Sequence, residues 1–259
     1  MHFSNRNLFH LALPLLAAFA VTGANAAVVF STGFESPAYS TVAIAGQNGW
    51  GVYGPGLSIV EGAFAKTGDQ AVFVDGGTAS QSGPYHTNVT TGPFVRLSAD
   101  LAIFTSSTQS EFQFGGLGAG LIGFLGGFNV LPNDSVQAIT AGYPIIGTFT
   151  RATAFDSTAW HHVELFFNIP AQVYDVTIDG VTLAAGLAFC GDNGPCNGAT
   201  LASYNNGLFD SFGINGTAND SGYMDNFQVE AFETAPEPAS ILLIATGLGA
   251  VILRRRKSN

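Results

Sequence analysis

The chain has 259 residues, with 8 Lys and Arg against 18 Asp and Glu, so its formal net charge is −10. This length suits one domain or two, and a composition that is 47% hydrophobic and 10% charged excludes an intrinsically disordered chain. The acidic balance offers no basic patch to neutralise phosphates, which argues against a nucleic-acid-binding protein.

Residues 1–26 have the features of a secretory signal peptide. Arg6 supplies a short positive region, Leu8 to Val21 is apolar, and Ala24-Asn25-Ala26 offers the small residues of a signal-peptidase site. A buried helix is the less favoured alternative, because the segment is N-terminal and short. We therefore expect export, with signal peptidase as the first processing partner.

Residues 27–233 are predicted to form one all-β domain. The region is rich in Val, Ile, Phe and Thr, with Gly, Asn, Asp and Pro between the apolar runs, which is typical of short strands and turns. From Phe94 to Phe104, apolar residues at odd positions alternate with Arg96, Ser98 and Asp100. Because each strand must bury one face, we predict a two-sheet antiparallel β-sandwich of the jelly-roll type.

Two aromatic residues near the start of this domain, Trp50 and Tyr53, stand among glycines. Sugar rings stack on flat aromatic faces, so both are candidate glycan-binding residues. The alternative is that they pack in the core or in a loop, as most buried Trp and Tyr side chains do. Trp160 begins a predicted core strand, and we expect it to pack in the core.

Glycines from Gly115 to Gly127 interrupt the β pattern and predict a loop or a weak, bulged strand. Gly118 to Gly123 matches the dinucleotide-binding fingerprint literally, but no βαβ pattern surrounds it, so we interpret the match as accidental. No nucleophile-elbow or metalloprotease motif occurs in the sequence. We therefore predict no catalytic residues and a chain that is not an enzyme.

The segment from Trp160 to Leu183 predicts an antiparallel hairpin. Apolar residues from Val163 to Ile169 share the parity that would face the core. The dipeptide Asp179-Gly180 between two β runs predicts a type I′ turn, with Val181–Leu183 as the return strand.

Three side chains on the first of these strands, His161, His162 and Glu164, invite interpretation as a metal or acid–base cluster. Adjacent residues on a strand point to opposite faces, so only His162 and Glu164 can cooperate. Two ligands do not make a site, and we interpret them as a surface pair.

Cys190 and Cys196, the only cysteines, enclose five residues. In an exported chain, this spacing favours a disulfide that closes a small loop. A catalytic thiol would need a basic neighbour, and two cysteines are too few for a typical zinc site.

The C-terminus carries a second targeting segment, residues 234–259. Pro236-Glu237-Pro238 precedes an uncharged apolar stretch, 239–253, and then Arg254, Arg255, Arg256 and Lys257. The stretch is short for a stable transmembrane helix, which needs about 20 apolar residues. The basic cluster should stay in the cytoplasm, which places the domain outside.

This order of motif, helix and basic cluster resembles the PEP-CTERM sorting signal of Gram-negative bacteria that make exopolysaccharide. The resemblance implies a membrane protease-transpeptidase, exosortase, that cuts near Pro236-Glu237-Pro238. The helix would then be a temporary tether in the inner membrane, as in the processing of a GPI tail. We expect the mature protein at the cell surface or in the extracellular matrix.

Removal of both terminal segments would make the chain more acidic. Only Lys66, Arg96 and Arg151 would remain against 17 carboxylates, which are the 18 acidic residues less Glu237, for a net charge of −14. Such a domain is repelled by anionic surfaces and suits neutral polymers or cations such as calcium.

Several short motifs of the domain are similar to those of known jelly rolls. Residues 160–163 and 174–181 resemble the central hairpin of laminin-G-like and concanavalin A-like lectins. Gly33-Phe34-Glu35, Gly49-Trp50, residues 68–71 and residues 223–227 resemble the opening and closing motifs of carbohydrate-binding modules. In those modules the opening Glu and closing Asp bind a structural calcium ion, which implies Glu35 and Asp225 here.

Asp225 also shares its strand parity with Phe227 and Val229, so we expect it to point toward the core, where a carboxylate needs a partner or a cation. The alternative to calcium is that Glu35 and Asp225 cap turns by accepting hydrogen bonds from backbone amides.

Three functions are compatible with these observations. The favoured one is a non-enzymatic, exported protein associated with exopolysaccharide or biofilm, which binds glycan through its jelly roll. The alternatives are a polysaccharide lyase or glycosidase of the same fold, and a purely structural matrix protein. The scarcity of Lys and Arg counts against a lyase, because a lyase must neutralise uronate.

Overall fold

Alternating apolar and polar residues form antiparallel strands throughout the part of the chain that the computed structural model describes. That part comprises residues 26–77, 82–105, 112–117, 124–131, 135–140, 145–150, 159–188, 208–216 and 220–233. Within these ranges there is no helix, and hence none that could cross a membrane. Residues 1–25 of the predicted signal peptide, the predicted Cys190–Cys196 disulfide and the segment 234–259 lie outside the described residues, whereas Ala26 begins β1.

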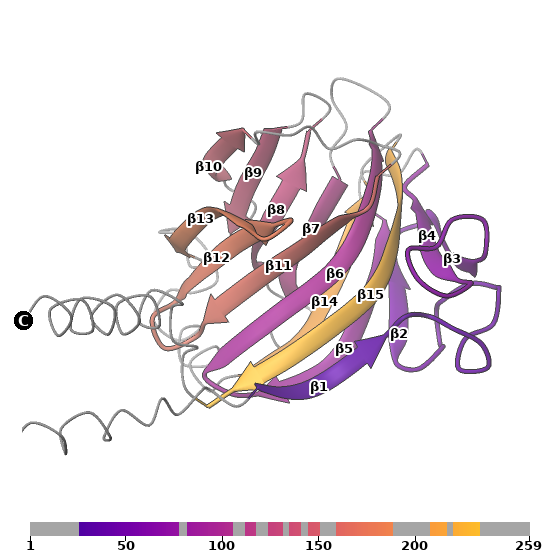
Figure 1. Ribbon diagram of the computed structural model, residues 1–259, viewed down its shortest axis with the longest axis horizontal. Helices are drawn as coiled ribbons and strands as arrows, with labels where there is room; N and C mark the ends of the chain where they lie inside the picture. Colours follow the sequence, from indigo (N-terminus) through magenta and orange to yellow (C-terminus); the bar gives the residue numbers. More distant parts are fainter. Residues whose placement is uncertain are drawn as a thin grey trace, which may run out of the picture. The chain divides into compact units, whose positions relative to one another are not determined.

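The first of two sheets has eight strands. They are β1 (Ala26–Thr32), β3 (Leu57–Glu61), β4 (Ala71–Asp75), β6 (Phe94–Thr105), β11 (His161–Asn168), β12 (Val173–Ile178), β13 (Val181–Ala188) and β15 (Asp220–Phe232). Their order is β13-β12-β11-β6-β15-β4-β3, and β1 also pairs with β15 (Figure 1). The first and last strands of the domain are therefore neighbours.

The second sheet has seven strands. They are β2 (Trp50–Tyr53), β5 (Gly83–Thr91), β7 (Phe112–Leu117), β8 (Phe124–Val130), β9 (Ser135–Thr140), β10 (Ile145–Thr150) and β14 (Leu208–Gly216). Their order is β10-β9-β8-β7-β14-β5-β2, and the named strands of both sheets pair antiparallel. The predicted all-β, two-sheet antiparallel sandwich is confirmed.

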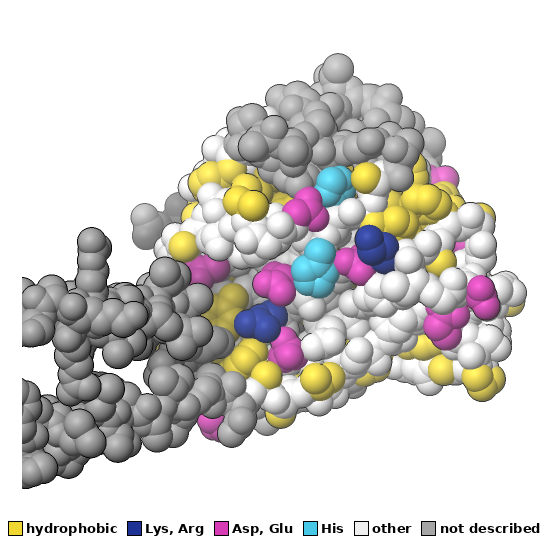
Figure 2. Space-filling view, viewed as in Figure 1, with side chains coloured by type: hydrophobic (Ala, Val, Ile, Leu, Met, Phe, Trp, Pro, Cys, Tyr) yellow, Lys and Arg dark blue, Asp and Glu magenta, His cyan; other side chains and the backbone are white. Residues whose placement is uncertain are grey.

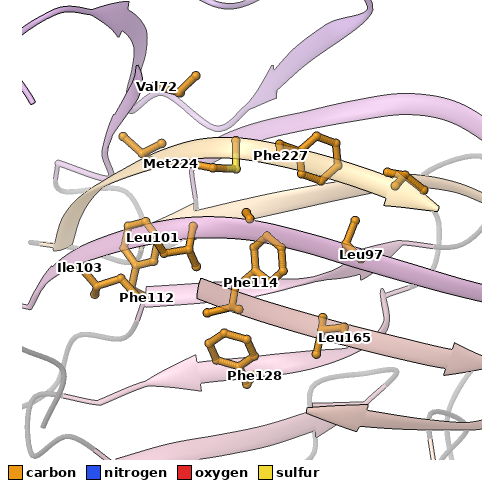
Figure 3. Close-up of a cluster of buried hydrophobic side chains, with 14 of the residues drawn as sticks. Val72, Leu97, Leu101, Ile103, Phe112, Phe114, Phe128, Leu165, Met224 and Phe227 are labelled. Carbon is orange, nitrogen blue, oxygen red and sulfur yellow. The ribbon is translucent and has the colours of Figure 1, made fainter. Parts of the chain in front are cut away.

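The core lies between the two sheets, where side chains of both interdigitate (Figure 3). Leu97 and Leu101 of β6 and Leu165 of β11 are fully buried, as their odd positions predicted. Phe114 and Phe128 meet them from the second sheet, with ring centroids 5.9 Å apart. Burying each of these large side chains contributes about 2 kcal/mol relative to exposure.

The predicted hairpin is present. Asp179 and Gly180 both have positive φ, 52° and 74°, as a type I′ turn requires. Ile178 pairs with Val181, but the return strand β13 runs to Ala188, beyond the predicted end at Leu183. Two register shifts accompany this extension, which the simple alternation did not predict.

The glycine-rich segment forms strand at both ends. Gly115 and Gly116 of β7 pair with Gly127 and Gly126 of β8, and the register shifts after Gly116, which confirms a bulged strand. Residues 118–123, with the accidental fingerprint, lie outside the described residues. Packing favours glycine at position 126, because a Cβ there would come within 2.7 Å of the Tyr174 ring. The Tyr174 hydroxyl lies 2.9 Å from the Gly127 carbonyl oxygen, which joins the two sheets.

Candidate functional site

The face of the first sheet that points away from the core, here called the outer face, carries an unusual mixture of aromatic and charged side chains. Even positions of β6 and β11 point there, together with their cross-strand partners on β15. Figure 2 shows His, Asp, Glu, Lys and Arg side chains gathered near the middle of this face. The candidate site therefore lies on this face.

An aromatic cluster occupies one end of the outer face. Its five members are half-buried and are here called the Trp160 cluster: Phe64, Phe73, Phe104, Trp160 and Tyr223. They come, in that order, from the loop 62–70, β4, β6, the residue before β11, and β15. Phe64 and Trp160 stack with centroids 5.2 Å apart and planes inclined by 14°. Tyr223 meets Phe64 edge-on at 5.3 Å. Such pairs hold flat ring surfaces at the edge of solvent.

One member of this cluster also carries a polar contact. The Tyr223 hydroxyl donates a hydrogen bond to Oε1 of Glu61 at 2.5 Å. Partial burial, and then the neighbouring Glu61 carboxylate, raise the pKa of Tyr223 to about 12. At neutral pH this hydroxyl is therefore a hydrogen-bond donor beside the aromatic surfaces.

The two tryptophans occupy positions opposite to those predicted. Trp160, expected in the core, shares the even parity of His162 and so lies on the outer face. Trp50, expected to bind glycan, is only 2% exposed. Its Nε1 donates to the Tyr39 hydroxyl at 3.1 Å, and its ring packs against Phe34 and Phe227. A buried ring cannot stack on a sugar, so the prediction for Trp50 is wrong.

Tyr53, the other predicted glycan-binding residue, lies half-buried on β2 of the second sheet. Its ring stacks near Tyr85 with centroids 6.2 Å apart. The structure therefore does not bring Tyr53 together with the Trp160 cluster, and its glycan contact stays a prediction.

Next to the Trp160 cluster, two carboxylates face each other across paired strands. Asp225 of β15 lies directly opposite Asp100 of β6, an arrangement that is unfavourable unless each charge is compensated. Asn226 Nδ2 donates to Asp100 Oδ2 at 2.7 Å. The Asp225 oxygens accept backbone amides instead.

His162 completes the compensation of Asp100. Its Nδ1 donates to Asp100 Oδ1 at 2.9 Å, and its Nε2 lies 3.4 Å from Oε1 of Glu164. The hydrogen bond to Asp100, then that to Glu164, raise the pKa of His162 to about 9. His162 is therefore a cation at neutral pH. The predicted pairing of His162 with Glu164 is confirmed, and His161 lies on the other face, bonded to Asp179.

Both carboxylates are held in their charged form by this histidine. Burial acts to raise the pKa of Asp100, but the hydrogen bonds from His162 and Asn226 outweigh it and the net shift is downward. For Glu164, the hydrogen bond to His162 is the main cause of a lowered pKa. Neither carboxylate is thus placed to act as a general acid near neutral pH.

At the far end of β6 the outer face becomes aromatic again. Phe94 and Phe166 stack with centroids 6.1 Å apart and planes 6° apart, and Phe232 meets Phe166 edge-on. We call these three residues the Phe166 cluster. Arg96 lies over the Phe232 ring at 5.1 Å and pairs with Glu230 at 3.1 Å.

Glu35 and Asp225 both hold the loop 62–70 that supplies Phe64. Asp225 Oδ2 accepts the amides of Lys66 and Thr67, each at 3.0 Å. The Glu35 carboxylate accepts the amides of Asp69 and Gln70. These two carboxylates therefore fasten the edge of the Trp160 cluster.

The predicted direction of Asp225 is wrong. A register shift at Asp225–Asn226, with positive φ at Asn226, reverses the parity of β15, so that Met224 and Phe227 face the core. Asp225 faces outward and is buried there. The bulge falls where the edge partner of β15 changes from β4 to β1.

The structure brings the predicted calcium ligands, Glu35 and Asp225, near each other. A Cβ on Gly33 would lie 3.7 Å from Asp225 Oδ1 and 3.9 Å from Cγ of Glu35. Their oxygens accept backbone amides, as the turn-capping alternative predicts. Within the described ranges, no group of three or more His, Cys, Asp or Glu side chains is arranged to hold a metal ion. Calcium binding stays a prediction.

The outer face was not predicted as a site from the sequence. The signal was the even parity shared by Trp160, His162, Glu164 and Phe166, which the predicted strand already contained. No local pattern places Phe64 or Tyr223 beside Trp160, because those contacts cross the sheet and a loop.

The comparisons with known proteins agree with the predicted sorting motif and with the predicted fold. Residues 234–257 match the PEP-CTERM protein-sorting motif. This confirms the predicted sorting motif, which marks an exported protein that is processed at the membrane. None of the curated proteins matches the chain by sequence.

Several solved structures share the fold. The carbohydrate recognition domain of Emp47p has a TM-score of 0.52 at 8% identity, covering 81% of this chain and 97% of that one. The endo-β-1,4-glucuronan lyase from the fungus Trichoderma reesei has a TM-score of 0.50 at 14% identity, covering 79% and 96%. A sialidase has a TM-score of 0.50 at 10% identity over 74% of this chain, which spans only 18% of the sialidase. At these identities the similarity shows the fold alone, and it confirms the predicted resemblance to jelly-roll, lectin-like domains.

Proposed function

We propose that this chain is a non-enzymatic surface protein that binds extracellular polysaccharide after processing by exosortase. The PEP-CTERM motif at residues 234–257 supports the processing step. The motif also supports a route through the inner membrane of a Gram-negative bacterium to the cell surface or to the biofilm matrix.

The Trp160 cluster is the observation that carries the binding function. It offers half-buried aromatic faces beside polar groups, namely the Tyr223 hydroxyl with its partner Glu61 and the exposed Lys66. Ligand sites combine apolar and aromatic surfaces with a few fixed polar groups in this way. A sugar ring presents an apolar face for stacking and hydroxyls for these polar partners.

The charged centre supports binding rather than hydrolysis. Both nitrogens of His162 face carboxylates, and these carboxylates are held ionised. Glycoside hydrolysis needs one carboxyl group that stays protonated as the acid, and the lowered pKa values of Asp100 and Glu164 do not suit them to that role. Burial raises the pKa of the neighbouring Asp225, but its carboxylate already accepts three backbone amides.

The binding proposal is tested with the processed protein purified from the producing bacterium. The protein is incubated with that organism's own extracellular polysaccharide. The Trp160→Leu variant is incubated with the same polysaccharide as a comparison. We expect retention on the polysaccharide, loss of retention in the variant, and no change in polymer size. A fall in polymer size would support the enzymatic alternative, and no retention would leave the structural-matrix alternative.

The processing proposal is tested in cells. Replacing Pro236, Glu237 and Pro238 by Ala should block exosortase and leave an unprocessed, membrane-bound chain. Replacing Arg254, Arg255 and Arg256 by Gln should disturb retention of the tail in the cytoplasm. Normal processing of the first variant, seen as an unchanged mature mass, would contradict the proposal.

We propose further that Glu35 and Asp225 bind a structural calcium ion. Their convergence on one loop supports this role. Calcium should then raise the melting temperature, and Glu35→Gln should remove the rise. A melting temperature that is the same in calcium and in chelator would leave amide capping as the role of both residues.

A further inference from the structure

The two aromatic clusters of the outer face lie at opposite ends of one strand. Phe94 of the Phe166 cluster is the first residue of β6, Phe104 of the Trp160 cluster is the last but one, and both point outward. Ten residue steps of strand at about 3.3 Å each put them roughly 33 Å apart. A single sugar cannot reach both clusters.

The surface between the clusters is polar along its whole length. Outward positions of β6 and its partners carry, in order, Asp100 opposite His162, Ser98 opposite Glu164, and Arg96 opposite Glu230. Asp100 and Ser98 are buried, so the donors and acceptors that a ligand could reach are those of His162, Glu164, Arg96 and Glu230. The outer face thus presents one strip with stacking surfaces at both ends and hydrogen-bonding groups between them.

The charges of this strip are already paired within the protein. His162 lies between Asp100 and Glu164, and Arg96 pairs with Glu230. Lys66 is exposed, at one end, and its charge also acts on Asp100. A uronate polymer would need cations that these carboxylates already occupy, and it would approach a domain whose predicted net charge is −14.

We propose that the site takes an extended, non-acidic polysaccharide segment that lies along β6 and stacks on both clusters at once. This inference rests on the proposed binding function and specifies its ligand. It requires an internal stretch of polymer rather than a chain end or a single sugar. It also separates this chain from the endo-β-1,4-glucuronan lyase of the same fold, whose polymer is acidic.

The test first measures which of glucan, xylan and mannan the processed protein binds most tightly. Neutral oligosaccharides of that polymer, from disaccharide to octasaccharide, are then used as a length series. Affinity should rise with length and level off once both clusters are reached. Phe166→Leu, which keeps an apolar side chain but removes the ring, should weaken binding of the longest member about tenfold and leave the disaccharide unchanged. Polygalacturonate should bind at least tenfold more weakly than the neutral polymer.

Phe149→Leu, on β10 of the second sheet, is the matched control and should change nothing. Equal melting temperatures of the variants and the parent protein establish that each has folded. If Trp160→Leu abolishes binding but length and Phe166→Leu have no effect, the extended site is wrong and the binding function stands. If no neutral polymer binds, the proposed function itself fails. Tighter binding of polygalacturonate would overturn the charge argument alone.

Discussion

The carboxylate of Asp225 accepts a hydrogen bond from the backbone amide of Lys66 at 3.0 Å, which ties the loop 62–70 to the last strand. The same side chain also accepts the amides of Thr67 and Asn226. Because Phe64 belongs to this loop, the stability of the loop and the shape of the Trp160 cluster depend on one buried carboxylate.

Asp225→Ala should lower the free energy of unfolding by about 3 kcal/mol, because it leaves three backbone donors without their acceptor. Urea unfolding measures the loss. Asp175→Ala is the control: Asp175 accepts the amide of Gly186 in an exposed hairpin, and its loss should cost about 1 kcal/mol or less. Equal losses in the two variants would show that Asp225 has no special role in holding the loop.

Gly68→Ala should destabilise the protein by about 2 kcal/mol. The residue has a φ of +64°, and an added Cβ would collide with Oε1 of Glu35. Gly46→Ala shares the positive φ, +83°, but its Cβ would meet nothing within 4 Å. Comparing their melting temperatures separates backbone strain from displacement of Glu35, and a smaller loss at Gly68 than at Gly46 would refute the clash.

Stability should fall as pH rises through the pKa of His162, which lies at about 9 in the folded protein. The folded-state pKa is higher than the ordinary value of 6.5, so the imidazolium stabilises the fold fully below pH 6.5 and not above pH 9. The change should be about 1 kcal/mol, less than the full shift implies, because the side chain is half-exposed to solvent.

Urea midpoints measured between neutral and alkaline pH test this expectation. His162→Gln should flatten the pH dependence in that range. At acid pH the sign is opposite, since the lowered pKa values of Asp100 and Glu164 mean that their stabilisation is lost as pH falls. If His162→Gln lost stability with rising pH as steeply as the parent protein, the loss at alkaline pH would be due to other groups.

Trp50→Ala should cost about 4 kcal/mol of stability, because it empties a core position packed by Phe34 and Phe227. Trp50→Phe should cost less and remove the hydrogen bond to Tyr39. Retention of Trp50→Phe on polysaccharide at a temperature where it is folded should match that of the parent protein. A specific loss of retention would restore Trp50 as a binding residue.

The strands were predictable where alternation is local and uninterrupted. The parity of β6 and β11 and the Asp179-Gly180 turn depend on a few adjacent residues, and all three are present in the structure. The orientation of Asp225 was not predictable in this way. A bulge at Asn226 shifts the strand by one residue, and the cause lies in pairing with two different strands, β4 and β1.

In the site too, some features follow from the local sequence and others depend on contacts between distant segments. Even parity alone puts Trp160, His162 and Glu164 on one face. The raised pKa of His162 needs Asp100 from another strand, and the Trp160 cluster needs Phe64 from a loop held by Glu35 and Asp225. Those contacts depend on tertiary pairing, which has no signature in a short window of sequence.

The central place of β15 has a mechanical consequence. This strand ends at Phe232, just before the sorting segment, and it is bonded to β6 on one edge and to β4 and β1 on the other. Tension applied at its C-terminal end acts along the strand, perpendicular to the hydrogen bonds that join it to its neighbours. The bonds on both edges would therefore be sheared together rather than broken one after another. A polymer that lies along β6 would pull on the adjacent strand in the same sheet. If the proposed polymer and an attachment at the C-terminal end pulled on the domain, the force would pass through a strand that is hydrogen-bonded along both edges.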